Sequence, residues 1–194
     1  MDIKGTGTVG LITYLRTDST RISEEADQAA RKYVSENYGE NYVAEGNNEA
    51  KKGTKKIQDA HEAIRPSDIS RTPVLVKESL SRDQFRLYQL IWKRFTASRM
   101  ANAVYETTQV KIQAGEYHFH VSASRLSFDG FMSVYVDDSA EKEENNVLLK
   151  GIGTDTVLNL KEFHPEQHFT QPPAHYTEAA LVKTLEELGI GRPS

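Results

Sequence analysis

Residues 81–124 read SRDQFRLYQLIWKRFTASRMANAVYETTQVKIQAGEYHFHVSAS, and the spacing of their apolar residues changes once along the stretch. In its first part they recur every three or four residues, as on one face of a helix, and Ser81 with Gln84 has capping-box spacing. From Tyr105 onward, β-branched and aromatic residues partly alternate with polar ones, which favours strands. The stretch therefore predicts a helix followed by an antiparallel β region. The helix positions expected in the core are Phe85, Tyr88, Ile91, Trp92 and Phe95.

Four strands are predicted in the β region, and glycine-containing stretches separate them. These stretches contain Gly115, the pair Asp129-Gly130, and Gly151–Gly153. Residues 137–146 are acidic and read as a solvated loop between two of the strands. The predicted strands are Thr107–Gln113, Tyr117–Ser124, Met132–Val136 and Val157–Phe163.

Helices are predicted on both sides of this stretch, so the fold class is α+β. Upstream, Ser23 is placed as an N-cap and Gly39 as a helix end. Downstream, a last helix is predicted from Thr177 to a C-cap at Gly189, after the pair Pro172-Pro173. Residues 44–60 are polar and lysine-rich, which is typical of a surface loop. The inward positions expected are Ala26, Ala29, Ala30, Tyr33 and Val34 in the first helix, and Leu181, Val182, Leu185 and Leu188 in the last.

Composition excludes several classes of site. The 194 residues include no cysteine, so there are no disulfides, thiolate zinc sites or cysteine nucleophiles. No apolar run is long enough for a membrane span, and no secretory signal is present, so we expect a cytoplasmic protein. Residues 1–100 carry a net charge of +3 and residues 101–194 one of −7. Because phosphate contacts depend on local charge, the first half is the better candidate for binding nucleic acid, although +3 is also compatible with ordinary scatter.

The segment GLITYLRTDST, residues 10–20, contains the first candidate site. A phenol has a pKa near 10 and becomes a good nucleophile when a cation favours the phenolate. If the segment is extended, Tyr14 and Arg16 project from the same side, and a guanidinium there could also bind a phosphate. A tyrosine with an arginine near a phosphate suits phosphoryl transfer to the tyrosine. The alternative is a strand tyrosine beside a surface arginine.

Two further clusters contain residues that bind phosphate. In HEAIRPS, residues 61–67, His61 and Arg65 are four apart and would share a face of a helical turn that Pro66 ends. GIGRPS, residues 189–194, combines glycine, arginine and serine in what could be a phosphate-contacting turn. Each cluster taken alone is equally compatible with a structural turn or a helix exit.

Two other patterns are assigned no function. Residues 5–10 match GxGxxG, but a dinucleotide site needs a strand before the motif and a helix after it, and LITY looks extended. His118 and His120 share a face of a predicted strand, without further residues at ligand spacing for a metal. His164 and His168 likewise give no metal site.

The three candidate clusters, in this order, resemble the motifs of type IA DNA topoisomerases. GLITYLRTDST resembles their active-site segment, HEAIRPS their second motif, and HFTQPPAHYTEAALVKTLEELGIGRPS, residues 168–194, the stretch that closes their core. The resemblance covers nearly the whole chain. HEAIRPS and the threonine after TDS are more similar to bacterial topoisomerase I than to topoisomerase III.

The resemblance implies a role for each matching residue. Tyr14 would attack a DNA phosphodiester and form a 5′-phosphotyrosine, and Arg16 would bind the scissile phosphate. Because the phosphotyrosine conserves the bond energy, religation would need no ATP. The residues implied in holding the segment or contacting DNA and phosphate are Thr17, Asp18, His61, Arg65, Arg192 and Ser194.

The resemblance also implies a domain division and missing parts. Residues 1–103 would be a helical gate domain, 104–173 part of a β hinge domain and 174–194 the start of another helical domain. The acidic cluster that binds Mg²⁺ in the family is not among these residues. We therefore expect an excised fragment that binds no metal and does not relax DNA alone. Its expected partners are single-stranded DNA, the other domains of the parent enzyme and, weakly, a second copy of the chain.

Other interpretations remain open at this point. The module could come from a reverse gyrase, or it could be a non-catalytic DNA-binding α+β module that forms no covalent adduct. A tyrosine recombinase or type IB enzyme would need a wider set of arginine and histidine residues than these motifs supply. For a topoisomerase I, the resemblance implies relaxation of negative supercoils in the cytoplasm, at the nucleoid.

Overall fold

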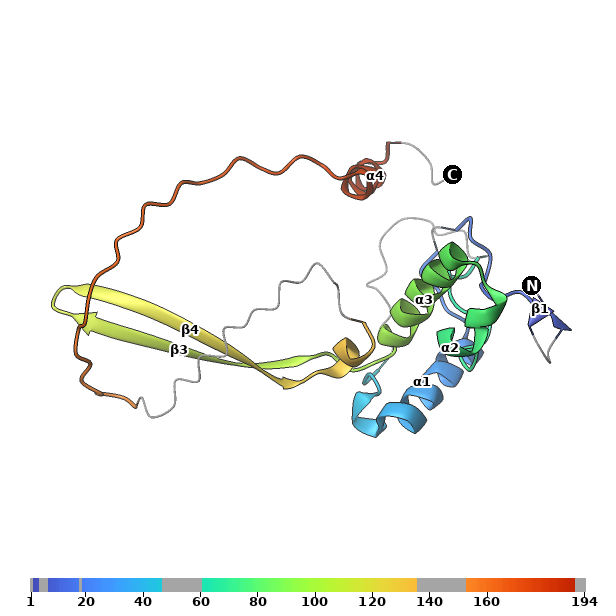
Figure 1. Ribbon diagram of the computed structural model, residues 1–194, viewed down its shortest axis with the longest axis horizontal. Helices are drawn as coiled ribbons and strands as arrows, with labels where there is room; N and C mark the ends of the chain where they lie inside the picture. Colours follow the sequence, from blue (N-terminus) through green and yellow to red (C-terminus); the bar gives the residue numbers. More distant parts are fainter. Residues whose placement is uncertain (1, 4–6, 18, 47–60, 136–152, 191–194) are drawn as a thin grey trace. The chain divides into compact units, whose positions relative to one another are not determined.

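The computed structural model describes residues 2–3, 7–17, 19–46, 61–135 and 153–190. It divides into two compact units, Met1–Val147 and Leu148–Ser194. This division differs from the predicted gate, hinge and third-domain boundaries, which remain a prediction. Both helices and antiparallel strands are present, so the predicted α+β class is confirmed (Figure 1).

Helix α1, Glu24–Tyr38, begins and ends where the sequence predicts. The Ser23 hydroxyl accepts a hydrogen bond from the Ala26 N–H at 3.4 Å, which satisfies a free amide of the first turn. Gly39 follows with φ +111°, a conformation that favours glycine, and its N–H donates to the carbonyls of Ser35 and Val34. The buried residues of α1 are Ala26, Ala30 and Val34, and a short 3-10 helix, η1, follows at Glu40–Tyr42.

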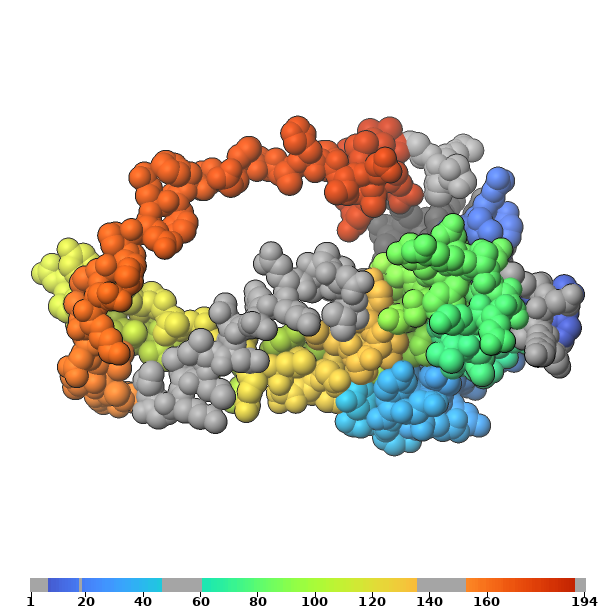
Figure 2. Space-filling view, in the orientation of Figure 1, coloured from blue at the N-terminus to red at the C-terminus, as the bar shows by residue number. Residues whose placement is uncertain are grey.

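Helix α3, Arg82–Ala97, supplies the aromatic side of the core. The predicted capping box is present, because the Gln84 N–H donates to the Ser81 hydroxyl and the Gln84 side chain accepts from the Ser81 N–H. Trp92 is buried, and its indole Nε1 donates to the Ile69 carbonyl at 2.9 Å. Helix α2, Pro73–Val76, and η2, Lys77–Ser79, precede α3. Figure 2 shows the α1 region (light blue) and the α2–α3 region (green) packed side by side.

The longest strands form one hairpin (Figure 1). Strands β3, Val104–Ala114, and β4, Tyr117–Phe128, pair antiparallel, so the predicted strands Thr107–Gln113 and Tyr117–Ser124 are confirmed. Near the N-terminus, β1, Asp2–Ile3, pairs with β2, Gly7–Thr8. The described residues 9–17 form no helix, whereas a dinucleotide site needs a helix directly after the motif.

The other two predicted strands are wrong over their described residues. The stretch Gly130–Ser133 forms a 3-10 helix, η3, because the chain turns back here and buries Val134 in the core. Residues 157–163 are exposed and belong to no strand. A strand requires hydrogen bonds to a neighbouring strand, and the sheets among the described residues consist of β1 with β2 and β3 with β4.

The second unit contains one described helix, α4, Glu178–Glu187. It begins as predicted, with the Thr177 hydroxyl accepting from the Ala180 N–H at 3.2 Å. Its C-cap is Leu188, one residue before the predicted C-cap Gly189, which follows at φ +73°. Figure 2 shows the segment from residue 153 (orange) as a single line of residues leading to α4. The apolar side chains expected to face inward are not buried: α4 has no buried residue.

No helix in the described ranges is both long enough and apolar enough to cross a membrane.

Candidate active site

The segment with Tyr14 lies antiparallel to the segment with His61 and Arg65. Ile12 forms a β-bridge with Pro66. The Thr13 N–H donates to the Arg65 carbonyl at 3.0 Å, as expected for the extended run predicted at residues 11–14. The helical turn expected at residues 61–65 is wrong. The backbone groups of this stretch form hydrogen bonds with the segment that contains Tyr14. These bonds replace the hydrogen bonds that a helical turn would form within the stretch.

The hydroxyl of Thr13 fixes the alignment of these segments. It donates to the Ala63 carbonyl at 2.8 Å and accepts from the Arg65 N–H at 3.0 Å. Two further bonds lie on either side, from the Ser67 hydroxyl to the Gly10 carbonyl at 2.6 Å and from the Ala63 N–H to the Arg21 carbonyl at 2.8 Å. Residues distant in sequence are therefore held in one alignment directly beside Tyr14.

This alignment brings the rings of Tyr14 and His61 together. Their centroids are 5.5 Å apart and their planes are tilted by 46°. The Tyr14 side chain is 60% exposed, whereas His61 is half-buried. A large ligand can therefore reach the tyrosine, and an imidazole lies next to the phenol.

The residues after Tyr14 leave the extended conformation. The chain bends at Leu15 and Arg16, so the alternation that would place Tyr14 and Arg16 on one side does not apply. Arg16 is exposed and takes part in no ion pair that the structure describes. Thr17 accepts the Ser19 N–H on its hydroxyl at 3.0 Å, and Ser19 is itself buried. Thr17 therefore has a local structural role, and the role in holding the segment that the resemblance implies for it stays a prediction.

Asp18, Arg192 and Ser194 lie outside the described residues. Their implied roles therefore remain predictions from the resemblance.

Arg65 is surrounded by protein acceptors. Its guanidinium pairs with the Glu62 carboxylate at 2.6 and 3.0 Å and also donates to the Pro66 carbonyl at 3.0 Å and to Ser23 Oγ at 3.4 Å. Only 13% of its side-chain surface is exposed. These bonds join the start of α1 to the HEAIRPS segment, so Arg65 has a structural role here whether or not it also contacts DNA.

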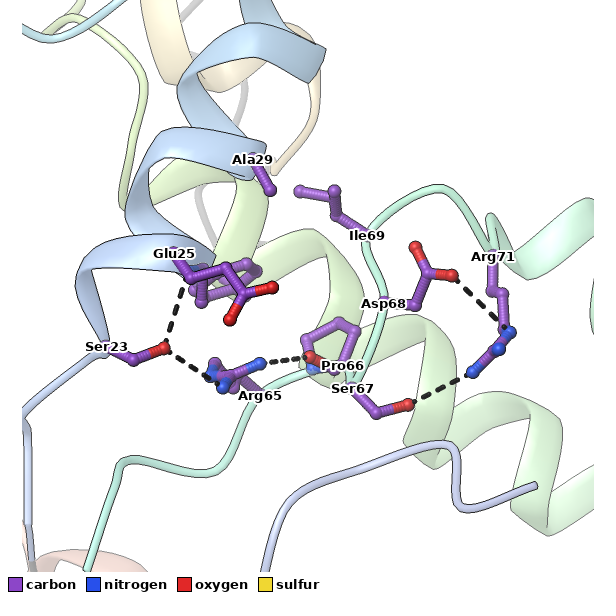
Figure 3. Close-up of a pocket in the computed structure, with 11 residues that line it drawn as sticks. Ser23, Glu25, Ala29, Arg65, Pro66, Ser67, Asp68, Ile69 and Arg71 are labelled. Atoms are coloured by element: carbon purple, nitrogen blue, oxygen red, sulfur yellow. Dashed lines mark hydrogen bonds and ion pairs between the residues drawn. The ribbon is translucent and has the colours of Figure 1, made fainter.

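A cavity of about 430 Å³ lies next to Arg65 and is lined by both basic and acidic groups (Figure 3). Arg71 pairs with Asp68 at 3.7 Å and donates to the Ser67 hydroxyl at 3.3 Å. Hydrogen bonds from Ser70 lower the pKa of Asp68, although its partial burial acts in the opposite direction. The carboxylates of Glu25 and Asp68 offset the two arginines, so the cavity has no excess of positive charge for an anion.

The part of the chain that the structure describes contains no group of three or more histidine, aspartate or glutamate side chains that could hold a metal ion. His118 and His120 lie on β4 opposite Gln113 and Lys111, which do not complete a metal site. These residues do not fit the Mg²⁺ site that the resemblance implies for the parent enzyme.

The role of Thr13 was not predicted from the sequence, although the residue lies inside the motif GLITYLRTDST. Its hydroxyl bonds to groups about 50 residues away, and no local pattern indicates such a partner. In the sequence, only the position of Thr13 next to Tyr14 pointed to this role.

Comparison with known proteins gives two findings. A family described as DNA topoisomerase matches residues 7–194. The solved structure of full-length topoisomerase I from Thermotoga maritima is similar to this chain, with a TM-score of 0.67 and 35% sequence identity. The match covers 98% of this chain and 30% of that one, so this chain spans less than a third of the length of the T. maritima protein.

Proposed function

We propose that this chain, which belongs to the bacterial DNA topoisomerase family, carries Tyr14 as the strand-cleaving residue of a type IA topoisomerase. By the parent enzyme we mean a topoisomerase that contains this chain and has roughly the length of the T. maritima protein. One observation supports the proposal above the others: an exposed tyrosine lies beside a histidine, inside the motif that resembles the family's active-site segment.

The proposed reaction exchanges one phosphate ester for another. The Tyr14 oxygen attacks the phosphorus of a DNA phosphodiester after losing its proton, and an oxygen–phosphorus bond forms. The bond from phosphorus to the 3′-oxygen breaks, and the leaving oxygen takes up a proton to become a 3′-hydroxyl. The 5′-phosphotyrosine stores the energy of the broken bond, so religation is the reverse attack by the 3′-hydroxyl and uses no ATP.

The surroundings of Tyr14 suit this reaction. Its exposure leaves room for a single DNA strand, and the exposed guanidinium of Arg16 carries a charge that can bind a phosphate. His61 is close enough to Tyr14 to contact a phosphate that the tyrosine attacks. We therefore propose single-stranded DNA as the substrate, and relaxation of negative supercoils at the nucleoid as the activity of the parent isomerase, with Mg²⁺ held by its other parts.

The test is covalent capture of DNA by the parent enzyme. Tyr14→Phe should keep single-strand binding and abolish the denaturant-resistant adduct, because the nucleophilic oxygen is lost. Tyr117→Phe is the matched control: it removes the hydroxyl of another exposed tyrosine and should leave the adduct unchanged. An adduct that persists in Tyr14→Phe would refute the assignment, and no adduct in the wild-type parent would favour a non-catalytic DNA-binding module.

A further inference from the structure

The segments of the two motifs pair like regular strands only around Pro66. Ile12 bridges Pro66, and beside this bridge the Thr13 N–H donates to the Arg65 carbonyl at 3.0 Å. In an antiparallel pair of this kind the two opposite residues exchange no hydrogen bonds, so the missing N–H of Pro66 leaves no bond unmade. If the ladder continued, the next pair, Thr13 with Arg65, would exchange two backbone bonds.

A side-chain bond takes the place of the second of these backbone bonds. A regular ladder would direct the Arg65 N–H to the backbone carbonyl of Thr13. It donates to Thr13 Oγ1 at 3.0 Å, and that hydroxyl donates in turn to the Ala63 carbonyl at 2.8 Å. The hydroxyl thus bonds backbone groups on both sides of Ile64, where the chain bends. A backbone carbonyl cannot replace it, because a carbonyl accepts hydrogen bonds but donates none.

The point at which regular pairing ends decides which residue lies next to Tyr14. In a continued antiparallel register Tyr14 would stand opposite Ile64, because each step forward on one segment is a step back on the other. The bend at Ile64 brings His61 to the phenol, and the two ring centroids are 5.5 Å apart. Tyr14 remains 60% exposed, so the imidazole lies beside the phenol without covering it.

Other bonds hold the HEAIRPS segment in place independently of the Thr13 hydroxyl. The guanidinium of Arg65 pairs with the Glu62 carboxylate at 2.6 Å, and the Ala63 N–H donates to the Arg21 carbonyl at 2.8 Å. These bonds connect the segment to itself and to the stretch before α1. The Thr13 hydroxyl connects it to the residue directly before the proposed nucleophile. Loss of that hydroxyl should therefore change the position of the segment relative to the nucleophile and leave the segment folded.

We propose that Thr13 is a positioning residue: its hydroxyl ends the pairing of the two segments and thereby sets the His61 imidazole beside Tyr14 for DNA cleavage. The part that concerns cleavage rests on the proposed function, in which Tyr14 attacks a DNA phosphate. The part that concerns the contact between the two rings stands without it. Thr13 acts through His61 in this role and does not bind the phosphate.

Nuclear Overhauser effects between the two rings test the positioning in the 194-residue chain. With histidine and tyrosine rings labelled, the wild type should show cross-peaks between ring protons of His61 and Tyr14. Thr13→Val should lose them, because a methyl group needs about 3.3–3.6 Å from an oxygen, whereas the hydroxyl lies 2.8 Å from the Ala63 carbonyl. Thr13→Ser retains the hydroxyl and should keep the cross-peaks.

Thr96→Val is the matched control for loss of a threonine hydroxyl. The hydroxyl of Thr96 also donates to a backbone carbonyl, that of Trp92 at 2.9 Å, but this bond lies within α3, so the cross-peaks should remain. If Thr13→Val does not fold, Thr13→Ala replaces it, because alanine removes the hydroxyl without adding bulk. Unchanged amide resonances of α3 show that a variant is folded. Cross-peaks that persist in the folded variant, or that disappear in Thr13→Ser, would overturn the proposal.

Single-turnover cleavage by the parent enzyme tests whether the ring contact affects the reaction. Thr13→Val should slow cleavage of a single strand about tenfold, as expected for the loss of two hydrogen bonds, with the Kd for DNA unchanged. Thr13→Ser should cleave at the wild-type rate. In a His61→Ala background, Thr13→Val should slow cleavage by less than about twofold, because its effect passes through the imidazole. Equal slowing in both backgrounds would show that Thr13 does not act through His61.

Failure of the positioning role and failure of the proposed function give different results. A covalent adduct that persists in Tyr14→Phe refutes the proposed nucleophile, but the cross-peaks in the 194-residue chain still decide whether Thr13 positions His61. Loss of the cross-peaks in Thr13→Val without slower cleavage would overturn the role of Thr13 in the reaction, while the adduct assay would still support Tyr14 as the nucleophile.

Discussion

At the scale of single residues, the arginines of the two motifs differ in their surroundings. Arg65 donates four hydrogen bonds to three protein acceptors, whereas Arg16 is exposed and takes part in no ion pair among the described residues. The charge of Arg16 therefore remains available for a ligand. His61, next to the exposed Tyr14 ring, is placed to act at the same point.

We expect Arg16→Ala and His61→Ala to slow DNA cleavage by the parent enzyme. Loss of one charge-assisted phosphate contact costs about 1.5–3 kcal/mol, which corresponds to roughly tenfold or more in rate. Single-turnover cleavage of an end-labelled single strand measures the effect. Arg86→Ala, on α3, serves as a control for loss of an exposed positive charge. Wild-type cleavage rates in both variants would contradict the proposed roles.

A second residue-scale prediction concerns pH. Burial raises the pKa of Asp27, but hydrogen bonds from Arg99 at 2.7 Å and Arg31 at 2.6 Å outweigh it and leave the pKa below its usual value. A carboxylate whose pKa is lowered by folding stabilises the protein above its unfolded pKa of about 3.9, and this contribution is lost as pH falls through the folded value.

Asp27→Asn should therefore lower the free energy of unfolding at pH 7 by about 1.5–3 kcal/mol, the range for hydrogen bonds to charged groups. The difference between variant and wild type should be smaller at pH 2.5 than at pH 7, because the contribution of the ionised carboxylate declines as pH falls toward its lowered folded pKa. Urea unfolding at the two pH values measures it. An equal difference at both would mean that the charge of Asp27 contributes nothing.

At the scale of elements, the β3–β4 hairpin has two different faces. Cross-strand pairs alternate between the faces, so Val110 with Val121 and Ile112 with Phe119 lie on one side. The other side carries polar pairs such as Lys111 with His120. Several side chains of the apolar face are more than 40% exposed, and such faces favour association.

We propose that a second copy of the chain weakly covers this apolar face, because exposed strand edges and apolar surface promote pairing. The net charge of −7 in residues 101–194 opposes association, so high salt should strengthen it. Val121→Asp should abolish it, whereas Ser122→Asp adds the same charge on the opposite face and should weaken it only slightly. Sedimentation at several concentrations in low and high salt measures this. A strictly monomeric wild type in both buffers would contradict the proposal.

At the scale of the whole molecule, this chain spans 30% of the T. maritima topoisomerase I that it resembles. The resemblance implies that relaxation also requires the domains that bind Mg²⁺ and close a ring around DNA. We therefore expect the purified 194-residue chain not to relax supercoiled plasmid, even with Mg²⁺ present. Gel electrophoresis of plasmid topoisomers tests this, with the parent enzyme as the positive control. Robust Mg²⁺-dependent relaxation by the chain alone would show that it contains a complete site.

The sequence by itself determined the features that depend on neighbouring residues. Ser23 and Ser81 are N-caps as predicted, and the last helix begins at Thr177 as predicted, because a cap bonds amides only two or three positions away. The two hairpin strands were predictable because Gly115, at φ +64°, lets the chain turn between two β-favouring runs. The segment that we propose contains the active site was recognised by its local motif.

Only the tertiary structure decided which distant segments meet. The alignment of Tyr14 with His61 depends on bonds from Thr13 to residues about 50 positions later. The same reason explains the errors: residues 61–65 pair with another segment and do not form a helical turn, and residues 157–163 find no partner strand among the described residues. Periodicity reports which side chains prefer burial, but pairing partners are selected by packing of the whole chain, which no local pattern specifies.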